Sequence, residues 1–298
     1  GDVYKRQQNR KVDQLHFGGG TPTFLSNQQM RWLVERIGTH FNLKDDDSGE
    51  YSIEIDPREA DADTIRTLRA VGFNRISLGV QDFDPDVQKA VNRIQSVAQT
   101  RTVVETARQE QFHGVAFDLI YGLPRQSWER FKKTLDQVIE LNPDRLSIFN
   151  YAHLPERFPP QRRIALEQLP GPEEKLDILA NTIEYLLQAG YVLIGMDHFA
   201  KPDDPLAIAQ KNGTLQRNFQ GYSTHAECDM VAFGVSSISQ VGGVFSQNVK
   251  TLEAYLKAID EQRLPIEKGL ITTDEDILRR RVIPVSYTHL TLPTIYSV

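Results

Sequence analysis

The sequence predicts an α/β fold built on a parallel sheet, and two observations support this class. Short apolar runs alternate with helical periods over residues 12–149, so strand and helix signals follow one another in turn. The chain is also 298 residues long and 40% hydrophobic, which suffices for one barrel-type domain or two medium ones. Strands that alternate with helices form parallel sheets with the helices outside. An open doubly wound sheet and a partial barrel remain the alternatives.

The order of the expected elements supports five strand–helix units. Ser26 is a suitable N-cap for the first helix, and Gly72 is a suitable C-terminal glycine for the second. The strands are expected at residues 12–17, 51–55, 75–80, 115–120 and 145–149, and the main helices at 63–71, 85–91, 97–109 and 128–141.

The pattern becomes less regular after about residue 150. Several prolines precede a long helix expected at residues 173–189, a strand at 191–194, an apolar segment at 230–244 and a helix at 252–262. We therefore expect a barrel domain over residues 8–152 and an appended α/β region over residues 153–283. Residues 1–7 and 284–298 do not continue the neighbouring patterns, so we expect a non-native leader and a non-native tail there.

Composition excludes several classes of function. A net charge of −6 argues against a nucleic-acid surface, and no apolar run reaches the ~18 residues of a membrane helix. The single cysteine, Cys228, fits a reducing cytoplasm and cannot complete a three-cysteine metal site. The seven histidines show no HxxxH or HExxH spacing, so no metal ligand is predicted among them.

Unusual polar and small residues follow each predicted strand. The run Gly18–Thr21 follows the first strand, and Glu54 and Gln81 lie at the ends of the second and third. Asp118 lies near the end of the fourth strand, and Asn150–Ala152 follow the fifth. The carboxyl ends of parallel barrel strands share one face, so we expect these residues to converge on one site.

Each of these residues also has a simpler interpretation. The glycine run is a tight turn or a place where the backbone approaches a ligand, and it matches neither GxGxxG nor a P-loop. Glu54 alternates with two apolar residues and so points away from the core, either into a structural salt bridge or toward ligand hydroxyls. Asp118 has the same two interpretations, and Arg93 taken alone would be a solvated charge.

The motifs together resemble the bacterial oxygen-independent coproporphyrinogen III oxidase family of radical S-adenosylmethionine (SAM) enzymes. The similarity runs from about residue 10 to residue 283 without a large gap. The motifs that carry it are HFGGGTPTFL from His16, SIEIDP from Ser52, GFNRISLGVQDF from Gly72, VNR from Val91, FDLIYGLP from Phe117, LNPDRLSIFNYAHLP from Leu141, GMDHFA from Gly195 and RNFQGYST from Arg217.

The resemblance implies a partial (β/α)6 barrel whose first strand, with a CxxxCxxC loop that binds a [4Fe–4S] cluster, does not lie within these residues. It also implies SAM as cofactor, with two molecules bound in the family. By motif position, Gly19 and Glu54 are expected to contact the cluster-bound SAM. The remaining expected contacts, of the second SAM or of the site in general, are Gly20, Thr21, Gln81, Arg93, Asp118, Ala152 and Ile238.

The implied reaction is the oxidative decarboxylation of two propionates of coproporphyrinogen III to vinyl groups, with an electron donor and an acceptor as further partners. No nucleic acid or membrane is expected as a partner, and the full-length protein is expected to be a cytoplasmic monomer. This piece is expected to be inactive without the cluster cysteines. Arg157, Arg162 and Arg163 are candidates for binding the anionic substrate, or else solvated loop residues.

Two alternatives stay open. One is the haem-chaperone branch of the same superfamily, although the GMDHFA and RNFQGYST motifs favour the oxidases. The other is a cluster-free (β/α) barrel that binds a phosphorylated metabolite, which would leave the ordered series of motifs unexplained.

Overall fold

The computed structural model describes residues 10–218, 221–225 and 228–279. The chain divides into two compact units, one ending at Leu193 but also including Asp197–Asp204, the other made of Ile194–Met196 and the residues from Pro205 on. Each unit is described by itself. The two ends predicted to be non-native lie outside the described residues.

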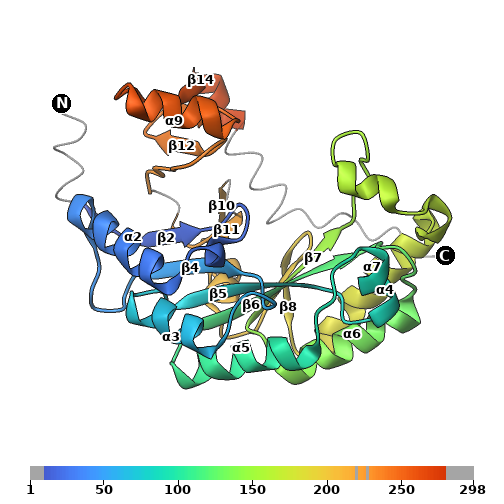
Figure 1. Ribbon diagram of the computed structural model, residues 1–298. Helices are drawn as coiled ribbons and strands as arrows, with labels where there is room; N and C mark the ends of the chain where they lie inside the picture. The colour runs from blue at the N-terminus through green and yellow to red at the C-terminus, as the bar shows by residue number, and fades with distance from the viewer. Residues whose placement is uncertain (1–9, 219–220, 226–227, 280–298) are drawn as a thin grey trace. The chain divides into compact units, whose positions relative to one another are not determined.

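The first unit is organised by a sheet with the strand order β2-β4-β5-β6-β7-β9-β8 (Figure 1). Its first five strands are parallel, which confirms the predicted parallel α/β arrangement, and β9 runs antiparallel to β7. The predicted strand at 12–17 is split in two, because β1 (Lys11–Val12) pairs with β3 (Asn42–Leu43) outside this sheet. The sheet strands are β2 (Gln14–Phe17), β4 (Glu50–Ile55), β5 (Arg75–Gln81), β6 (Gly114–Tyr121), β7 (Arg145–Asn150), β8 (Val192–Gly195) and β9 (His198–Ala200).

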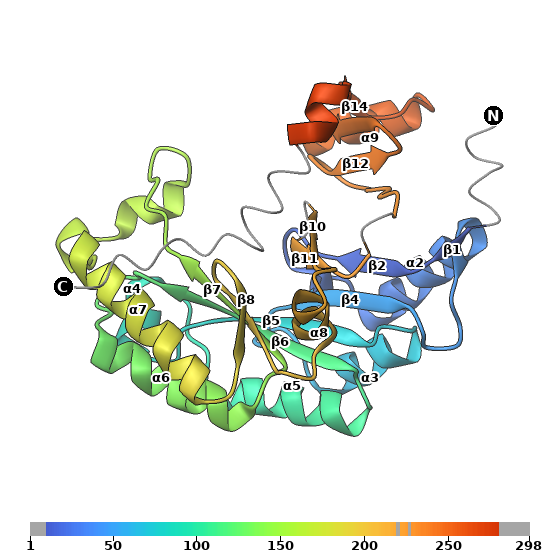
Figure 2. The same ribbon diagram turned by 180° about the vertical axis from the view of Figure 1, so that it is seen from behind.

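Helices of the first unit lie against one face of this sheet (Figures 1 and 2). Ser26 is the N-cap of the first of them, as predicted, and the structure adds a reciprocal capping box with Gln29. Gly72 follows another with φ of 105°, a conformation that glycine adopts without strain. The helices are α2 (Asn27–His40), α3 (Ala62–Ala70), α4 (Pro85–Ala90), α5 (Val97–Gln109), α6 (Trp128–Leu141) and α7 (Pro172–Gln188).

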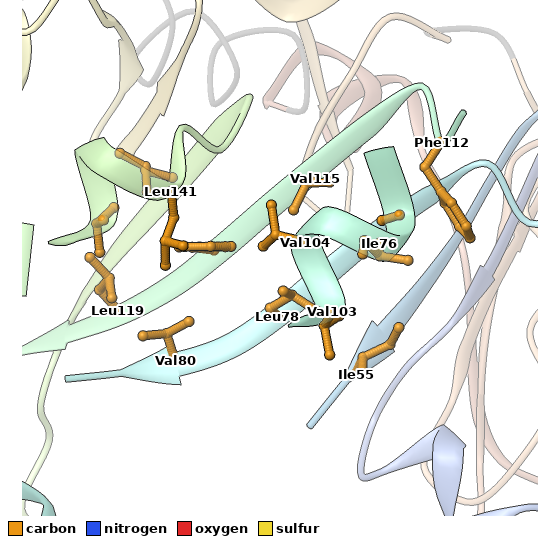
Figure 3. Packing of buried hydrophobic residues seen from close by; sticks show 14 of the residues in the cluster. Ile55, Ile76, Leu78, Val80, Val103, Val104, Phe112, Val115, Leu119 and Leu141 are labelled. Carbon is orange, nitrogen blue, oxygen red and sulfur yellow. The ribbon is translucent and has the colours of Figure 1, made fainter. Parts of the chain in front are cut away.

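The two faces of the sheet differ in chemistry. Along β4 the buried residues Tyr51, Ile53 and Ile55 alternate with partly exposed Ser52 and Glu54. The same alternation continues along β5 and β6, so apolar side chains fill the space between sheet and helices. Figure 3 shows this core, with Ile55, Ile76, Leu78, Val103 and Leu119 among its members. The opposite face, which we call the inner face, carries mainly polar and small residues, with Ile120 and Phe149 as larger apolar members.

The described part of the second unit contains two small antiparallel sheets, β10–β11 and β12-β13-β14. Its helices include α8 (Pro205–Lys211) and α9 (Leu252–Asp260), and residues 274–279 are also helical. The strands are β10 (Gln216–Asn218), β11 (Gly221–Ser223), β12 (Ile238–Val241), β13 (Val244–Asn248) and β14 (Ile266–Ile271).

The first compact unit extends past residue 152, after which the sequence pattern becomes less regular. The first unit continues further because β9 pairs with β7 and Ile178 and Leu186 of α7 join its core. Among the described residues, no helix is both long and apolar enough to cross a membrane.

Candidate functional site

Most of the predicted site residues lie at the carboxyl ends of β2, β4, β5, β6 and β7, a border we call the carboxyl edge. The glycine run follows β2 directly, and Glu54 is the last inner-face residue of β4. Gln81 ends β5, Asp118 lies on β6, and Ala152 follows β7 by two residues. The expectation that parallel strands would bring these segments to one edge is therefore met by the fold.

Glu54 is held by neighbours on β2 and the loop after it. Gly19 donates its backbone N–H to Glu54 Oε2 at 3.2 Å, and His16 Nε2 lies 3.4 Å from Glu54 Oε1. The bond from His16 and then the bond from Gly19 outweigh burial and lower the pKa of Glu54, so the group is a carboxylate at neutral pH. No Arg or Lys pairs with it among the described residues, which leaves its oxygens suited to ligand hydroxyls.

Gly18, Gly19 and Gly20 have two different structural roles. A Cβ at Gly18 would lie 2.6 Å from His16 Nε2 and 2.7 Å from Glu54 Oε1, so the missing side chain makes room for this contact. Gly19 and Gly20 have φ of 80° and 155°, and a Cβ at either would meet nothing within 4 Å. These two positions thus expose backbone beside the carboxylate, which suits the close approach of a ligand.

Gln81 and Arg93 meet above Gly79 on the inner face. Arg93 Nη2 donates to the Gly79 carbonyl at 2.7 Å, and a Cβ at Gly79 would lie 3.0 Å from the Gln81 amide nitrogen. Gln81 has φ of 66° where the register with β6 shifts, a left-handed conformation that is uncommon for glutamine. Residues held in such a conformation are enriched at ligand-binding sites.

Arg93 is not a solvated charge, contrary to the simpler interpretation of its sequence. It lies in the turn after α4 with its side chain only 22% exposed, and its Nη1 is 3.2 Å from Asp56 Oδ2. The Nε of Arg93 is buried without a hydrogen-bond partner among the described residues. A buried donor without a partner is costly, so a ligand acceptor would stabilise it.

Asp118 is held by hydroxyl groups and not by a cation. Ser77 of β5 donates to Asp118 Oδ2 at 2.9 Å, and Ser147 of β7 contributes a second side-chain hydrogen bond. Burial raises the pKa of Asp118 despite these bonds, and the neighbouring charge of Glu54 acts in the same direction. A structural salt bridge was one interpretation of both Glu54 and Asp118. Neither carboxylate pairs with a lysine or an arginine among the described residues.

The remaining predicted residues are less closely linked. Thr21 begins a short 3-10 helix, η1 (Pro22–Phe24), beside exposed Gly20. The Ala152 carbonyl accepts a hydrogen bond from Gln161 Nε2 at 3.1 Å. Ile238 is the first residue of β12 and belongs to the second unit.

A buried polar network lies behind this edge, and the sequence did not reveal its contacts. Asp82 is 2% exposed and accepts hydrogen bonds from Thr134 Oγ1 and Gln126 Nε2, both at 2.5 Å. Gln88 is also buried; it donates to the Asp82 carbonyl at 2.9 Å and accepts a hydrogen bond from the backbone N–H of Gln95 at 3.1 Å. The network connects the loops after β5 and β6 and so fixes the segment that carries Gln81. Each partner is more than five residues from Asp82, and such pairings leave no local signal in sequence.

The residues present fit SAM better than an iron–sulfur cluster. Backbone at Gly19 and Gly20, the Glu54 carboxylate and the buried Arg93 donor together suit an amino-acid nucleoside with hydroxyl and carboxylate groups. A cluster requires several thiolates, whereas the chain has one cysteine, which is exposed and belongs to the second unit. Within the described ranges no group of three or more His, Cys, Asp or Glu residues could hold a metal ion.

Comparison with known proteins defines the class first. Residues 2–138 match the model of the radical SAM superfamily. The structure superposes on a solved coproporphyrinogen III oxidase from Escherichia coli, described as a radical SAM enzyme, with a TM-score of 0.92 and 46% identity over 96% of this chain and 68% of that one. The chain belongs to the oxygen-independent coproporphyrinogen III oxidase family of radical SAM proteins, which confirms the resemblance seen in its motifs.

Curated relatives agree with this assignment. The oxygen-independent coproporphyrinogen III oxidase of Pseudomonas aeruginosa is 57% identical over 293 residues, which cover 98% of this chain and 64% of the relative. The corresponding protein of Synechocystis is 50% identical over 276 residues, 93% of this chain and 59% of the relative. The chain therefore spans about three fifths of the length of these relatives.

Proposed function

We propose that this chain forms the SAM-binding part of an enzyme that oxidatively decarboxylates coproporphyrinogen III, converting two propionates to vinyl groups in haem biosynthesis. Its family membership supports this substrate, since the relatives are named for it. The five parallel strands are proposed to be part of a (β/α)6 barrel whose first strand lies outside these residues. The setting is proposed to be cytoplasmic, with an electron donor and an acceptor as partners.

The contact between Gly19 and Glu54 carries the proposal. It places a carboxylate and exposed glycine backbone together at the carboxyl edge, where parallel α/β barrels bind their ligands. Glu54 would accept hydrogen bonds from ribose hydroxyls, and Gly19 would present its backbone to the methionine moiety. Gly20, Thr21, Gln81, Arg93, Asp118, Ala152 and Ile238 are proposed as further contacts, some of them to a second SAM.

Bound SAM would supply the radical that starts the reaction, and the residues of this chain bind, orient and shield it. Arg93 would orient an acceptor group through its buried Nε, and Asp118 would present oxygens already aligned by Ser77 and Ser147. The cluster that the superfamily uses does not fit the residues present, so we propose that this chain alone assembles none and is inactive. Anaerobic reconstitution should then leave no stoichiometric iron on the chain.

Calorimetric titration with SAM tests the proposal. Replacing Glu54 with Gln keeps its shape but weakens charge-assisted hydrogen bonds, so the affinity for SAM should fall about tenfold or more. Glu50→Gln is a matched control, because Glu50 lies on the same strand and face, at the other end of β4. If Glu54→Gln and Glu50→Gln bound SAM with equal affinity, Glu54 would have a structural role and not a binding role.

A further inference from the structure

Lys175 places a cation between the ends of two sheet strands. Its Nζ donates to the carbonyl of Tyr151, the first residue after β7, at 3.2 Å. Its aliphatic stem passes beside Gly122, the first residue after β6, where an added Cβ would lie 2.8 Å from Lys175 Cε. Gly122 has φ of 82°, so glycine is favoured there for its conformation as well as for the space it leaves. The ammonium is thus held at the carboxyl edge by contacts from two strand ends.

The position of Lys175 is unfavourable for the fold alone. It lies in the fourth residue of α7, near the positive end of the helix dipole, where cations are disfavoured. It is partly buried, and it forms no ion pair with any described residue, including Glu173 and Glu174 of the same turn. One carbonyl uses one of the three donors of an ammonium group. A bound anion would compensate for this arrangement.

The loop that begins at Tyr151, the residue that Lys175 contacts, carries three arginines and an exposed aromatic ring. Arg157, Arg162 and Arg163 form no ion pairs within the described part of the chain, and Arg162 Nε is oriented by the Pro155 carbonyl at 3.1 Å. Phe158 of the same loop is 48% exposed. Guanidinium groups bind carboxylates, and exposed aromatic rings pack on flat apolar ligands. The surface matches a flat macrocycle that carries several carboxylates.

We propose that Lys175 binds a carboxylate of the ligand at this edge, and specifically a propionate of the tetrapyrrole, with the loop at residues 153–164 contacting the macrocycle. The inference rests on the proposed function. Lys175 binds and positions, while the radical chemistry belongs to SAM. The amino-acid carboxylate of SAM is a second source of the same chemistry, so the experiment must separate the two.

The test uses the whole chain and three ligands. The first ligand is coproporphyrin III, a stable oxidised form of the proposed substrate with four propionates. Its binding, and that of its uncharged tetramethyl ester, is measured by the quenching of porphyrin fluorescence. SAM is titrated separately by calorimetry. Lys175→Met keeps the stem that packs on Gly122 and removes the charge. Lys133→Met is the matched control, because Lys133 is an exposed lysine of α6 without an ion pair in the described residues.

The expected result is an affinity for coproporphyrin III about tenfold or more lower in Lys175→Met, with the ester and SAM binding as in the parent chain and Lys133→Met unchanged. A loss of affinity for SAM but not for the porphyrin would overturn the propionate assignment. Equal porphyrin affinity in the two variants, or no saturable porphyrin binding by the parent, would also overturn it. The proposed function is judged separately, by whether the parent chain binds SAM through Glu54.

Discussion

The two ends of the inner face both carry charge, but they use it differently. At the amino ends of the strands, Arg145 Nε lies 2.8 Å from Asp204 Oδ2, and Glu50 and Arg75 lie at 3.8 and 3.9 Å from members of this pair. At the carboxyl edge, four strand residues further along β4, Glu54 is held by a histidine and a backbone N–H. Cations thus match anions at one end, and mainly neutral donors orient anions at the other.

This difference separates stability from binding. At the amino end, carboxylates and guanidinium groups pair mainly with one another, although Arg145 Nη2 is buried there without a hydrogen-bond partner among the described residues. Groups held by hydroxyls, amides and backbone keep their charge available, which a binding site requires. Ligands of parallel α/β barrels bind at the carboxyl end, in keeping with this division. The predictions below compare matched changes at the two ends, beginning with the largest expected effect.

The largest effect is expected at Arg145. Replacing it with Met removes the closest cation from Asp204, whose side chain is only 4% exposed, and leaves Arg75 at 3.9 Å. Breaking a buried ion pair by removing one partner costs about 3 kcal/mol or more. Urea denaturation should show this loss, while SAM affinity at low temperature changes less than twofold. Weakened SAM binding by the folded variant would mean that the two ends are coupled.

Two glycines allow a milder comparison. A Cβ at Gly114 would lie 2.4 Å from Arg75 Nη1 at the amino end, as one at Gly18 would lie 2.7 Å from Glu54 Oε1 at the carboxyl edge. Gly114→Ala should therefore lower the unfolding free energy by about 1–2 kcal/mol, because a buried guanidinium must move. Gly18→Ala should change stability less and SAM affinity more, because it displaces a partly exposed carboxylate from the site.

Thermal melts and calorimetry on the same two preparations check this comparison. Each substitution, Gly114→Ala or Gly18→Ala, adds one methyl group to the chain. Each variant is therefore the control for the size of the change in the other. If both substitutions lowered stability equally and neither changed SAM affinity, the glycine run would be a turn and nothing more.

Local signals explain why so much of the sheet was predictable. Alternation in SIEI placed Glu54 on the inner face, and a helical period gave α6 its observed bounds, Trp128–Leu141. These features depend on neighbours within a few residues, and the sequence states them directly.

Long-range pairings explain what was missed. Arg93 meets Asp56 from 37 residues away, and Lys175 meets Tyr151 across 24. Neither pairing leaves a periodic trace in the sequence. Arg93 was therefore selected as a site residue by its motif alone, and Lys175 was not selected at all. Ile238 was selected by motif alone, and its role stays a prediction because it belongs to the second unit.

The smallest expected effect is a difference in pH dependence between Glu54 and Asp118. The bond from His16 helps to lower the pKa of Glu54, whereas burial raises the pKa of Asp118. A lowered pKa gives stability that is present above the unfolded value, near 4.3, and is lost as the pH falls through the folded value. A raised pKa gives the opposite: stability present below about 3.9 that is lost as the pH rises through the folded value.

The two substitutions should therefore give stability differences of opposite slope. Asp118→Asn removes the buried charge while its amide can still bond to the hydroxyls of Ser77 and Ser147, which donate or accept. It should stabilise the chain by up to about 1 kcal/mol at pH 7 and by less at pH 4. Glu54→Gln should instead lose stability relative to the parent at pH 7 and match it near pH 3. Urea titrations at pH 3, 4, 5.5 and 7 measure both differences. If the stability difference from the parent chain changed with pH in the same direction for both variants, the pKa values of Glu54 and Asp118 would be shifted in the same direction. The contrast between His16 beside Glu54 and the hydroxyls beside Asp118 would then be wrong.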